Sequence, residues 1–147
     1  MSDLLYDEPV TPTALHDRDA VRDVLLSYAR GVDSRDLARV AACFTPDAAY
    51  DGALGRGTID DALLTLRDAM ARYSATVHRM GNQVVAVDGD RARSETDCLA
   101  EHVLADGTHV VVAVRYRDAL VRRPDGWRIA SRTVTTLWRR QEQPAHV

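Results

Sequence analysis

Residues 76–139 read TVHRMGNQVVAV-DG-DRARSETDCLAEHVLA-DG-THVVVAVRYRDALVRRP-DG-WRIASRTVTTLWR, with Asp-Gly pairs at 88–89, 106–107 and 125–126. Asp-Gly is typical of tight hairpin turns, because glycine readily adopts the positive φ angles that such turns require. Between the pairs, apolar and polar residues alternate with a period of two, as in strands with one buried face. The stretch therefore predicts an antiparallel meander of four strands, at residues 76–87, 92–104, 108–120 and 127–139.

The residues before this meander show helical spacing instead. From Asp17, apolar residues recur at intervals of three and four, which predicts a helix that ends between Gly31 and Ser34. The elements predicted after it are a short helix over 37–44 stopped by Pro46, a short strand over 48–51, a Gly-rich loop over 52–57, and a third helix from its N-cap Thr58 to about Tyr73.

Helices first and long strands afterwards are the order of an α+β domain. We expect a curved antiparallel sheet packed against three N-terminal helices, with a cone-shaped pocket where helices and sheet splay apart at one end. A chain of 147 residues suits one domain, here residues 1–147 with a core at about 15–139. Residues 1–14 and 140–147 are predicted to be loosely held ends.

The composition excludes several classes of function. All 19 basic residues are Arg, which removes Schiff-base, P-loop and pyridoxal-phosphate mechanisms that need a lysine. The net charge is −3 and no basic stripe is interleaved with aromatic residues, so no nucleic-acid partner is expected. No Gly-x-Gly-x-x-Gly loop and no closely spaced His pair is present, so we expect neither a dinucleotide cofactor nor a metal.

The sequence also suggests a location. No apolar run approaches the roughly 20 residues needed to cross a bilayer, and the N-terminus lacks the charge and apolar pattern of a signal peptide. Cys43 and Cys98 lie far apart among apolar or small residues, which favours two buried free thiols over a disulfide. We therefore expect a cytoplasmic protein without a membrane partner.

Few ionisable residues fall in segments that should be buried. From spacing alone, Asp33 is most simply an ordinary carboxylate at a helix end, although its charge there opposes the helix dipole and so favours a functional role. His78 lies in an apolar strand, where it is either a core histidine or a base whose second ring nitrogen is held by Asp33. Spacing does not show whether the two side chains meet.

Five further residues are candidates with two interpretations each. His102 stands at the end of a row of small residues and faces either a cavity or solvent. Alternation puts Glu101 on the opposite sheet face, unless a bulge turns it inward. Tyr28 and Tyr50 are either phenol donors to a substrate carbonyl or core residues. Arg132 is either outside or functional, because an inward Arg at this position would be costly without an anionic partner.

Three stretches resemble the SnoaL-like proteins of the nuclear transport factor 2-like superfamily. They are VLLSYARGVDSRDLARVAACFTPDAAY at 24–50, TVHRMGN at 76–82 and GWRIASR at 126–132. The resemblance spans roughly residues 15–139 and implies the cone-shaped α+β fold. It is less specific about activity, because this fold hosts many functions.

The site chemistry resembles that of scytalone dehydratase and related small dehydratases. This resemblance implies an acid–base pair at Asp33 and His78, with further catalytic residues at Tyr50, Tyr28 and His102. Tyr28 has the spacing of a tyrosine that bile-acid dehydratases use, five residues before the Asp. Two weaker matches imply substrate-binding roles: a carboxylate at Glu101, and the anion-binding arginine of dehydrochlorinases at Arg132.

These matches imply a cofactor-independent lyase, a dehydratase acting on a small hydroxylated carbonyl compound that is polyketide-like or steroid-like. One alternative is a polyketide cyclase or double-bond isomerase in the same pocket. Another is a non-catalytic module that binds a small ligand or dimerises. We expect a small hydrophobic substrate as partner. An exposed sheet face with Val111, Val121 and Trp138 further predicts a homodimer or higher homo-oligomer.

Overall fold

The computed structural model describes residues 11–144 and opens with helix α1, Pro12–Asp33. Thr11 caps the helix by accepting a hydrogen bond from the backbone N–H of Ala14, and Pro12 occupies the first turn, where its missing N–H costs nothing. The predicted start at Asp17 is therefore too late, and residues 12–14 are helical rather than loosely held. The first turn carries no buried apolar residue that periodicity could detect. Predictions for residues 1–10 and 145–147 lie outside the described residues.

The segment between α1 and the meander differs most from expectation. It contains helix α2 (Leu37–Ala42), strand β1 (Phe44–Gly52), strand β2 (Gly55–Thr58) and helix α3 (Ile59–Met70). Phe44 continues the apolar spacing of α2 but begins β1, and Pro46 lies inside that strand. The pairing of β1 with β6 shifts register between Phe44 and Ala49. Pro46, which has no backbone N–H to donate, therefore sits where the ladder is irregular and does not require that hydrogen bond.

The Gly-rich residues predicted as a loop include a strand. β2 pairs with β1 in a tight hairpin in which Gly52 opposes Gly55. All residues of β2 are exposed, so it lacks the apolar alternation by which strands are recognised. The predicted N-cap of α3 is confirmed, because the Thr58 side chain accepts from the N–H of Asp61.

The four-strand meander is confirmed. Its strands are β3 (Tyr73–Asp88), β4 (Arg91–Leu104), β5 (His109–Arg123) and β6 (Gly126–Glu142). Gly89, Gly107 and Gly126 all have positive φ angles, as the predicted turns require. β6 runs on to Glu142, so the prediction that residues 140–142 are loosely held is wrong; they pair with the start of β5.

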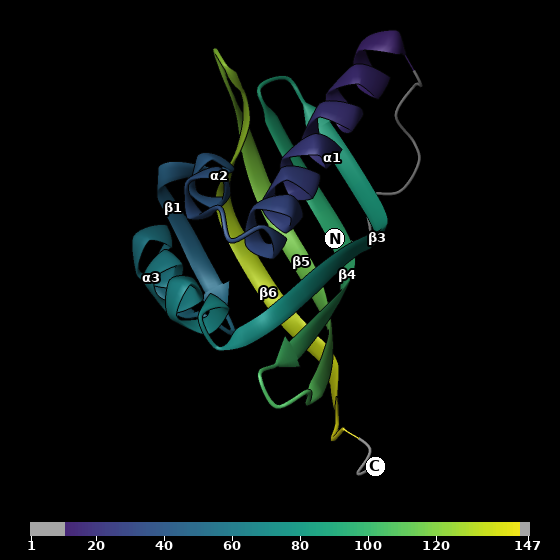
Figure 1. Ribbon diagram of the computed structural model, residues 1–147. Helices are drawn as coiled ribbons and strands as arrows, with labels where there is room; N and C mark the ends of the chain where they lie inside the picture. The colour runs from purple at the N-terminus through teal and green to yellow at the C-terminus, as the bar shows by residue number, and fades with distance from the viewer. Residues whose placement is uncertain (1–10, 145–147) are drawn as a thin grey trace.

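The sheet order is β2-β1-β6-β5-β4-β3, with β1 parallel to β6 and all other neighbours antiparallel. The sheet is strongly twisted, and the helices lie on one of its faces (Figure 1). The core fills the space between them. It includes Val21 and Leu25 of α1, Leu66 of α3, and Leu120 and Ile129 of the meander. This arrangement confirms the α+β class.

The structure also bears on two smaller predictions. Cys43 and Cys98 are buried free thiols, as expected. Of the residues predicted on an exposed sheet face, Trp138 is exposed as expected, but Val111 is buried at 6 % exposure and Val121 is half-buried. Within residues 11–144, no helix is both long enough and apolar enough to span a membrane.

Candidate active site

A cavity of about 250 Å³ opens between the C-terminal half of α1, the end of α3 and the concave face of the sheet. Its wall is mostly apolar, with a few polar side chains pointing inward. The polar and aromatic residues that line it are Tyr28, Tyr50, Arg72, Tyr73, Thr76, His78, His102, Tyr116 and Thr136. Sites for drug-sized ligands usually measure roughly 300–1,000 Å³, so this cavity suits a smaller molecule.

Asp33 and His78 meet at this cavity. Asp33 is the last residue of α1, and His78 lies on β3, on the strand face that looks toward the helices. Nδ1 of His78 lies 2.8 Å from Oδ1 of Asp33. The side chain of His78 is 9 % exposed and that of Asp33 24 % exposed. The hydrogen bond predicted between the two residues is therefore present, across 45 residues of sequence.

Two further hydrogen bonds fix the carboxylate of Asp33. The Thr76 hydroxyl donates to Oδ1 at 3.0 Å, and the backbone N–H of His78 donates to Oδ2 at 2.9 Å. Burial raises the pKa of Asp33, but these donors and the His78 ring outweigh it, so that the pKa lies below its ordinary value. Asp33 is thus held as a carboxylate, which can only accept hydrogen bonds.

This charge state determines the tautomer of His78. Because the Asp33 carboxylate has no proton to donate, Nδ1 of the imidazole must carry the hydrogen between them. In the neutral ring, Nε2 then holds the lone pair. Within residues 11–144, Nε2 has no hydrogen-bond partner, and His78 lines the cavity. The pair therefore presents a basic nitrogen to whatever occupies the cavity.

His102 lies in the same cavity, on β4. Its ring centroid is 5.6 Å from that of His78 and 4.7 Å from that of Tyr73. Burial lowers the pKa of His102, and the nearby His78 lowers it further, so a neutral ring is favoured. Its Nδ1 is buried and makes no hydrogen bond of ordinary geometry among the described residues.

Three phenols surround the base of the cavity. Tyr28 and Tyr50, both singled out from the sequence, line it together with Tyr116. Burial raises the pKa of each phenol, so all three stay protonated and can donate a hydrogen bond at neutral pH. The Tyr28 ring packs edge-on against Tyr116 at 5.9 Å and against Phe44 at 6.1 Å. Tyr28 and Tyr50 are therefore core residues that also line the cavity, and their role as phenol donors to a substrate stays a prediction.

Arg132 points inward but does not line the cavity. Its guanidinium donates to Asp118 through Nε at 2.7 Å and Nη2 at 2.9 Å, and both side chains are 0 % exposed. The guanidinium carbon lies 4.3 Å from the ring centroids of Tyr28 and Tyr116, so these rings stand between it and the cavity. The expected substrate-binding role of Arg132 is therefore corrected: its anionic partner is Asp118, the residue directly opposite on β5.

Glu101 lies on the other face of the sheet. It pairs with Arg79 and, at 3.1 Å, with His109, and it does not line the cavity. Its place between Ala100 and His102, which do line the cavity, shows that β4 keeps its alternation here without a bulge that would turn Glu101 inward. The expected substrate-binding role of Glu101 is therefore wrong.

Arg72, Tyr73 and Thr136 of the cavity wall were not predicted from the sequence, and neither were three residues that support the site. Thr76 lies two positions before His78 on the same face of β3 and fixes the carboxylate. Tyr116 and Asp118 continue the inward row of β5 that begins at Val110 and passes through Val112 and Val114. Alternation within the strands could have placed all three on the inner face. The described residues contain no group of three or more His, Cys, Asp or Glu that could hold a metal ion.

Comparisons with known proteins support this architecture. Residues 13–133 match the family model of the SnoaL-like domain. Rv2910c, an uncharacterized protein of Mycobacterium tuberculosis, is 33% identical over 131 residues, which cover 86% of this chain and 89% of that protein.

Two crystal structures share the fold at low sequence identity. One is a protein from Novosphingobium aromaticivorans provisionally named scytalone dehydratase, with a TM-score of 0.82 and 21% identity over 94% of this chain and 93% of that one. The other is the hexachlorocyclohexane dehydrochlorinase LinA-type3 of Novosphingobium barchaimii, with a TM-score of 0.77 and 21% identity over 90% and 94%. At these identities the likeness shows the nuclear transport factor 2-like fold alone. With the family match over residues 13–133, the chain belongs to the SnoaL-like domain family.

Proposed function

We propose that the chain is a cofactor-independent lyase that removes water from a small hydroxylated carbonyl compound, such as a polyketide-like β-hydroxy ketone; the cavity of about 250 Å³ favours such a molecule over a steroid-like one. One observation carries the proposal. The His78 ring is anchored by Asp33 through Nδ1 at 2.8 Å, while Nε2 is left without a partner among the described residues at a mostly apolar cavity. A basic nitrogen in an apolar cavity suits removal of a proton from carbon.

The first step is proton abstraction. Nε2 of His78 takes the proton from the carbon next to the carbonyl, and the electron pair of that C–H bond forms an enolate. The Asp33 carboxylate stabilises the imidazolium that results, because it already accepts the Nδ1 hydrogen. A general base of this kind contributes roughly 10²–10⁴-fold to the rate.

The second step is loss of hydroxide. The phenol of Tyr50 or Tyr28 donates a hydrogen bond to the enolate oxygen. Negative charge develops on this oxygen, and a preorganised donor there lowers the energy of the transition state. The enolate then re-forms the carbonyl, a carbon–carbon double bond appears, and the bond to the β-hydroxyl breaks. The proton on His78, or one delivered through His102, joins the departing hydroxide as water. No oxidant, reductant or metal enters this balance.

Two facts about the environment support the catalytic reading over a non-catalytic ligand-binding or dimerisation module. A binding module has no need of a carboxylate–imidazole pair in an apolar cavity, and His78 turned to solvent would have favoured that alternative. Its side chain is instead 9 % exposed and lines the cavity. In addition, Nδ1 of His78 is held by Asp33 at 2.8 Å, the arrangement that leaves Nε2 as a base.

The test is turnover of a panel of β-hydroxy ketones followed by mass spectrometry. A product lighter by one water is expected for the wild type. His78→Ala and Asp33→Asn are expected to lose roughly 10²–10⁴-fold in kcat/KM while circular dichroism shows an intact fold. His109→Ala is the matched control, because His109 lies on the opposite sheet face beside Glu101 and is expected to retain full activity.

The outcomes separate the alternatives. A product of unchanged mass that still requires His78 and Asp33 identifies a cyclase or double-bond isomerase that uses the same base. Near-full activity in both variants would show that the pair is structural and would overturn the proposal. Tight ligand binding without any turnover would favour the non-catalytic module.

A further inference from the structure

One charged side chain in the wall of the cavity takes no part in the proposed reaction. Arg72 follows the end of α3 and lines the cavity next to Tyr73, the first residue of β3. Among the described residues of the wall, it is the one with a permanent charge, and none of the others is Asp or Glu. A guanidinium keeps its proton at any ordinary pH. The cavity therefore carries a fixed positive charge that nothing in its own wall balances.

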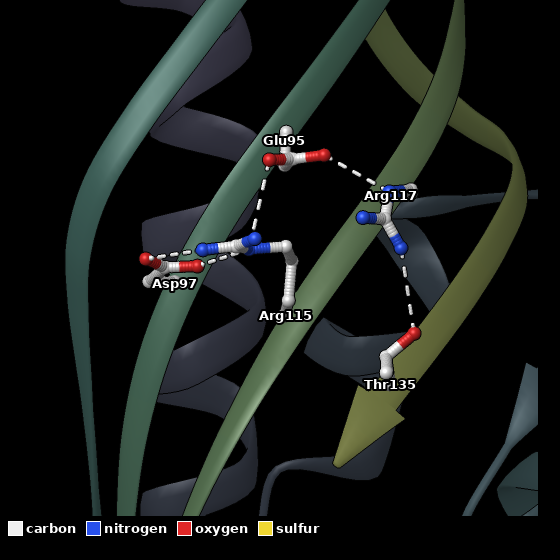
Figure 2. A network of polar contacts seen from close by, with 5 residues as sticks. All are labelled: Glu95, Asp97, Arg115, Arg117 and Thr135. Carbon is white, nitrogen blue, oxygen red and sulfur yellow. Dashed lines mark hydrogen bonds and ion pairs between the residues drawn. The ribbon is translucent and has the colours of Figure 1, made fainter. Parts of the chain in front are cut away.

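Arginines on the outer face of the sheet have acidic partners. Arg115 binds Asp97 through Nε at 2.6 Å, and Arg117 binds Glu95 through Nε at 2.9 Å (Figure 2). These pairs lie on neighbouring strands, where opposite charges stabilise a sheet. Arg72, by contrast, is exposed, and within residues 11–144 its guanidinium makes no hydrogen bond or ion pair. It can therefore bind an anion that comes from outside the chain.

A second arginine lies at the same end of the cavity. Arg139 of β6 is directly opposite Val112 of β5, so both side chains leave the same sheet face, and Val112 lines the cavity. Arg139 is exposed and its guanidinium donates to the neutral amide of Gln141 at 2.9 Å, which leaves its charge unbalanced. Burial lowers the pKa of His102 most, and the positive charge of Arg139 lowers this pKa further. Arg139 therefore acts on the polar end of the cavity, and we call Arg72 and Arg139 the arginine rim.

A carboxylate is the group that the arginine rim suits. The paired N–H donors of a guanidinium match the two oxygens of a carboxylate. An acid group at the exposed rim keeps part of its water, whereas an acid group among the apolar side chains of the cavity would lose that water at a high cost. The enclosed Arg132 could not offset this cost, because its guanidinium is already bound to Asp118. A ligand with one acidic end and one apolar end therefore binds with its charge outermost.

We propose that the substrate carries a carboxylate, which the arginine rim binds while the ketone end of the molecule enters the cavity toward His78. This rests on the proposed dehydration and narrows its substrate to a hydroxy keto acid whose acid group lies away from the reacting carbon. Arg72 and Arg139 then determine specificity, because they fix which end of the substrate reaches Nε2 of His78. The carboxylate is bound alike before and during the reaction, so the arginine rim is expected to lower KM and to leave kcat nearly unchanged.

Binding of an unreactive keto acid tests the arginine rim without any turnover. β-Benzoylpropionate has a ketone and a carboxylate but no hydroxyl to lose, and its methyl ester is the uncharged match. The wild type is expected to bind the acid about tenfold more tightly than the ester, because each of two exposed charge pairs contributes about threefold in Kd. Isothermal titration calorimetry at low ionic strength measures both Kd values. Added salt is expected to weaken binding of the acid and not of the ester.

Variants of the arginine rim are expected to remove this preference. Arg72→Gln and Arg139→Gln each lose about threefold in affinity for the acid, and the double variant binds acid and ester alike. Arg72→Glu binds the acid more weakly than the ester, because like charges then meet. Arg67→Gln on α3 and Arg140→Gln on β6 are the matched controls and are expected to behave as the wild type, since both residues are exposed and neither lines the cavity. Circular dichroism checks the fold of each variant.

The outcomes separate this proposal from the proposed reaction. Equal affinity of the wild type for acid and ester, or no binding of either at millimolar concentration, would overturn the role of the arginine rim. So would a preference for the acid that the double variant retains, because the carboxylate would then bind elsewhere. A preference that the double variant abolishes supports the arginine rim even if no hydroxy ketone is turned over, in which case the proposed reaction fails alone. Conversely, turnover of hydroxy ketones without a lower KM for those that bear a carboxylate would keep the reaction and exclude the arginine rim.

Discussion

Two carboxylate–base pairs lie on the concave side of the sheet. Their hydrogen bonds are similar in length, but their exposure and the type of base differ. Asp33 and His78 join the end of α1 to β3 at the cavity, with side chains 24 % and 9 % exposed. Asp118 and Arg132 join β5 to β6 beneath the tyrosines, and both side chains are 0 % exposed. In each pair the carboxylate accepts from the base at 2.7–2.8 Å.

The two bases differ in whether they can exchange a proton, although their hydrogen bonds to the carboxylates are similar. Imidazole can gain and lose a proton near neutral pH, and His78 keeps one nitrogen at the cavity. A guanidinium stays charged under all ordinary conditions, and Arg132 is enclosed by Asp118 and aromatic rings. We therefore propose chemistry for the first pair and a structural role for the second.

The largest effect is expected from breaking the enclosed pair. Arg132→Met leaves the buried Asp118 without its counter-charge, and removal of one partner of such a pair typically costs about 3–5 kcal/mol. Chemical denaturation measures the free energy of unfolding. The double variant Arg132→Met/Asp118→Leu is expected to recover most of the loss, because apolar replacement of a whole buried pair is often neutral. Arg122→Met is the matched control and is expected to lose less, because Arg122 is 38 % exposed. A loss below about 1 kcal/mol in Arg132→Met would contradict the structural role.

A smaller effect is expected from the support of the open pair. Thr76→Val keeps the shape of the side chain but removes the hydroxyl that donates to Asp33 at 3.0 Å. The loss of one such bond typically costs about 0.5–1.5 kcal/mol of unfolding free energy, and more when it leaves a charged acceptor short of a donor. Ser74→Ala, on the same strand with an exposed hydroxyl, serves as the control. Equal losses in the two variants would show that Thr76 has no special role in holding Asp33.

The smallest effect is expected in how the free energy of unfolding depends on pH under acidic conditions. The folded-state pKa of Asp33 lies below the ordinary 3.8, so its stabilising contribution is complete above that value and is lost as the pH falls through the folded pKa. The free energy of unfolding of Asp33→Asn is therefore expected to fall less steeply than that of the wild type below about pH 4. Urea titrations at stepwise lower pH compare the slopes. Identical slopes would mean that Asp33 titrates alike in the folded and unfolded chains.

The sequence predicted the meander better than the segment before it, for a physical reason. Strands β3 to β6 alternate and are separated by Asp-Gly turns, two signals that do not depend on distant residues. β2 has neither, since all its residues are exposed and its shape follows from pairing with β1. Phe44 fits helical spacing equally well, and only pairing with Ile129 of β6 makes it a strand residue.

The residues of the site could likewise be predicted from the sequence only in part. Asp33 and His78 were candidates from their residue types, but only the resemblance joined them, because local spacing carries no information across 45 residues. Arg132 was correctly predicted to need an anion if it pointed inward, yet the anion is Asp118 and not a substrate. Alternation along β5 puts Asp118 inward, but Arg132 joins Ile129 on the inner face only because the pairing of β6 with β5 shifts register between Ile129 and Ser131. Alternation alone therefore does not give the pairing.

The hydrogen bonds of Asp33 also have a consequence for protein engineering. The carboxylate holds both the ring and the backbone of His78, so one contact between α1 and β3 sets the base. Much of the cavity wall comes from other strands, including Val112 of β5 and Val134 of β6. Under the proposed reaction, substrate scope and proton chemistry would thus be carried by separate parts of the chain. Libraries that vary Val112 and Val134 can reshape the cavity while the base keeps its position, which makes this small domain a practical scaffold for new specificities.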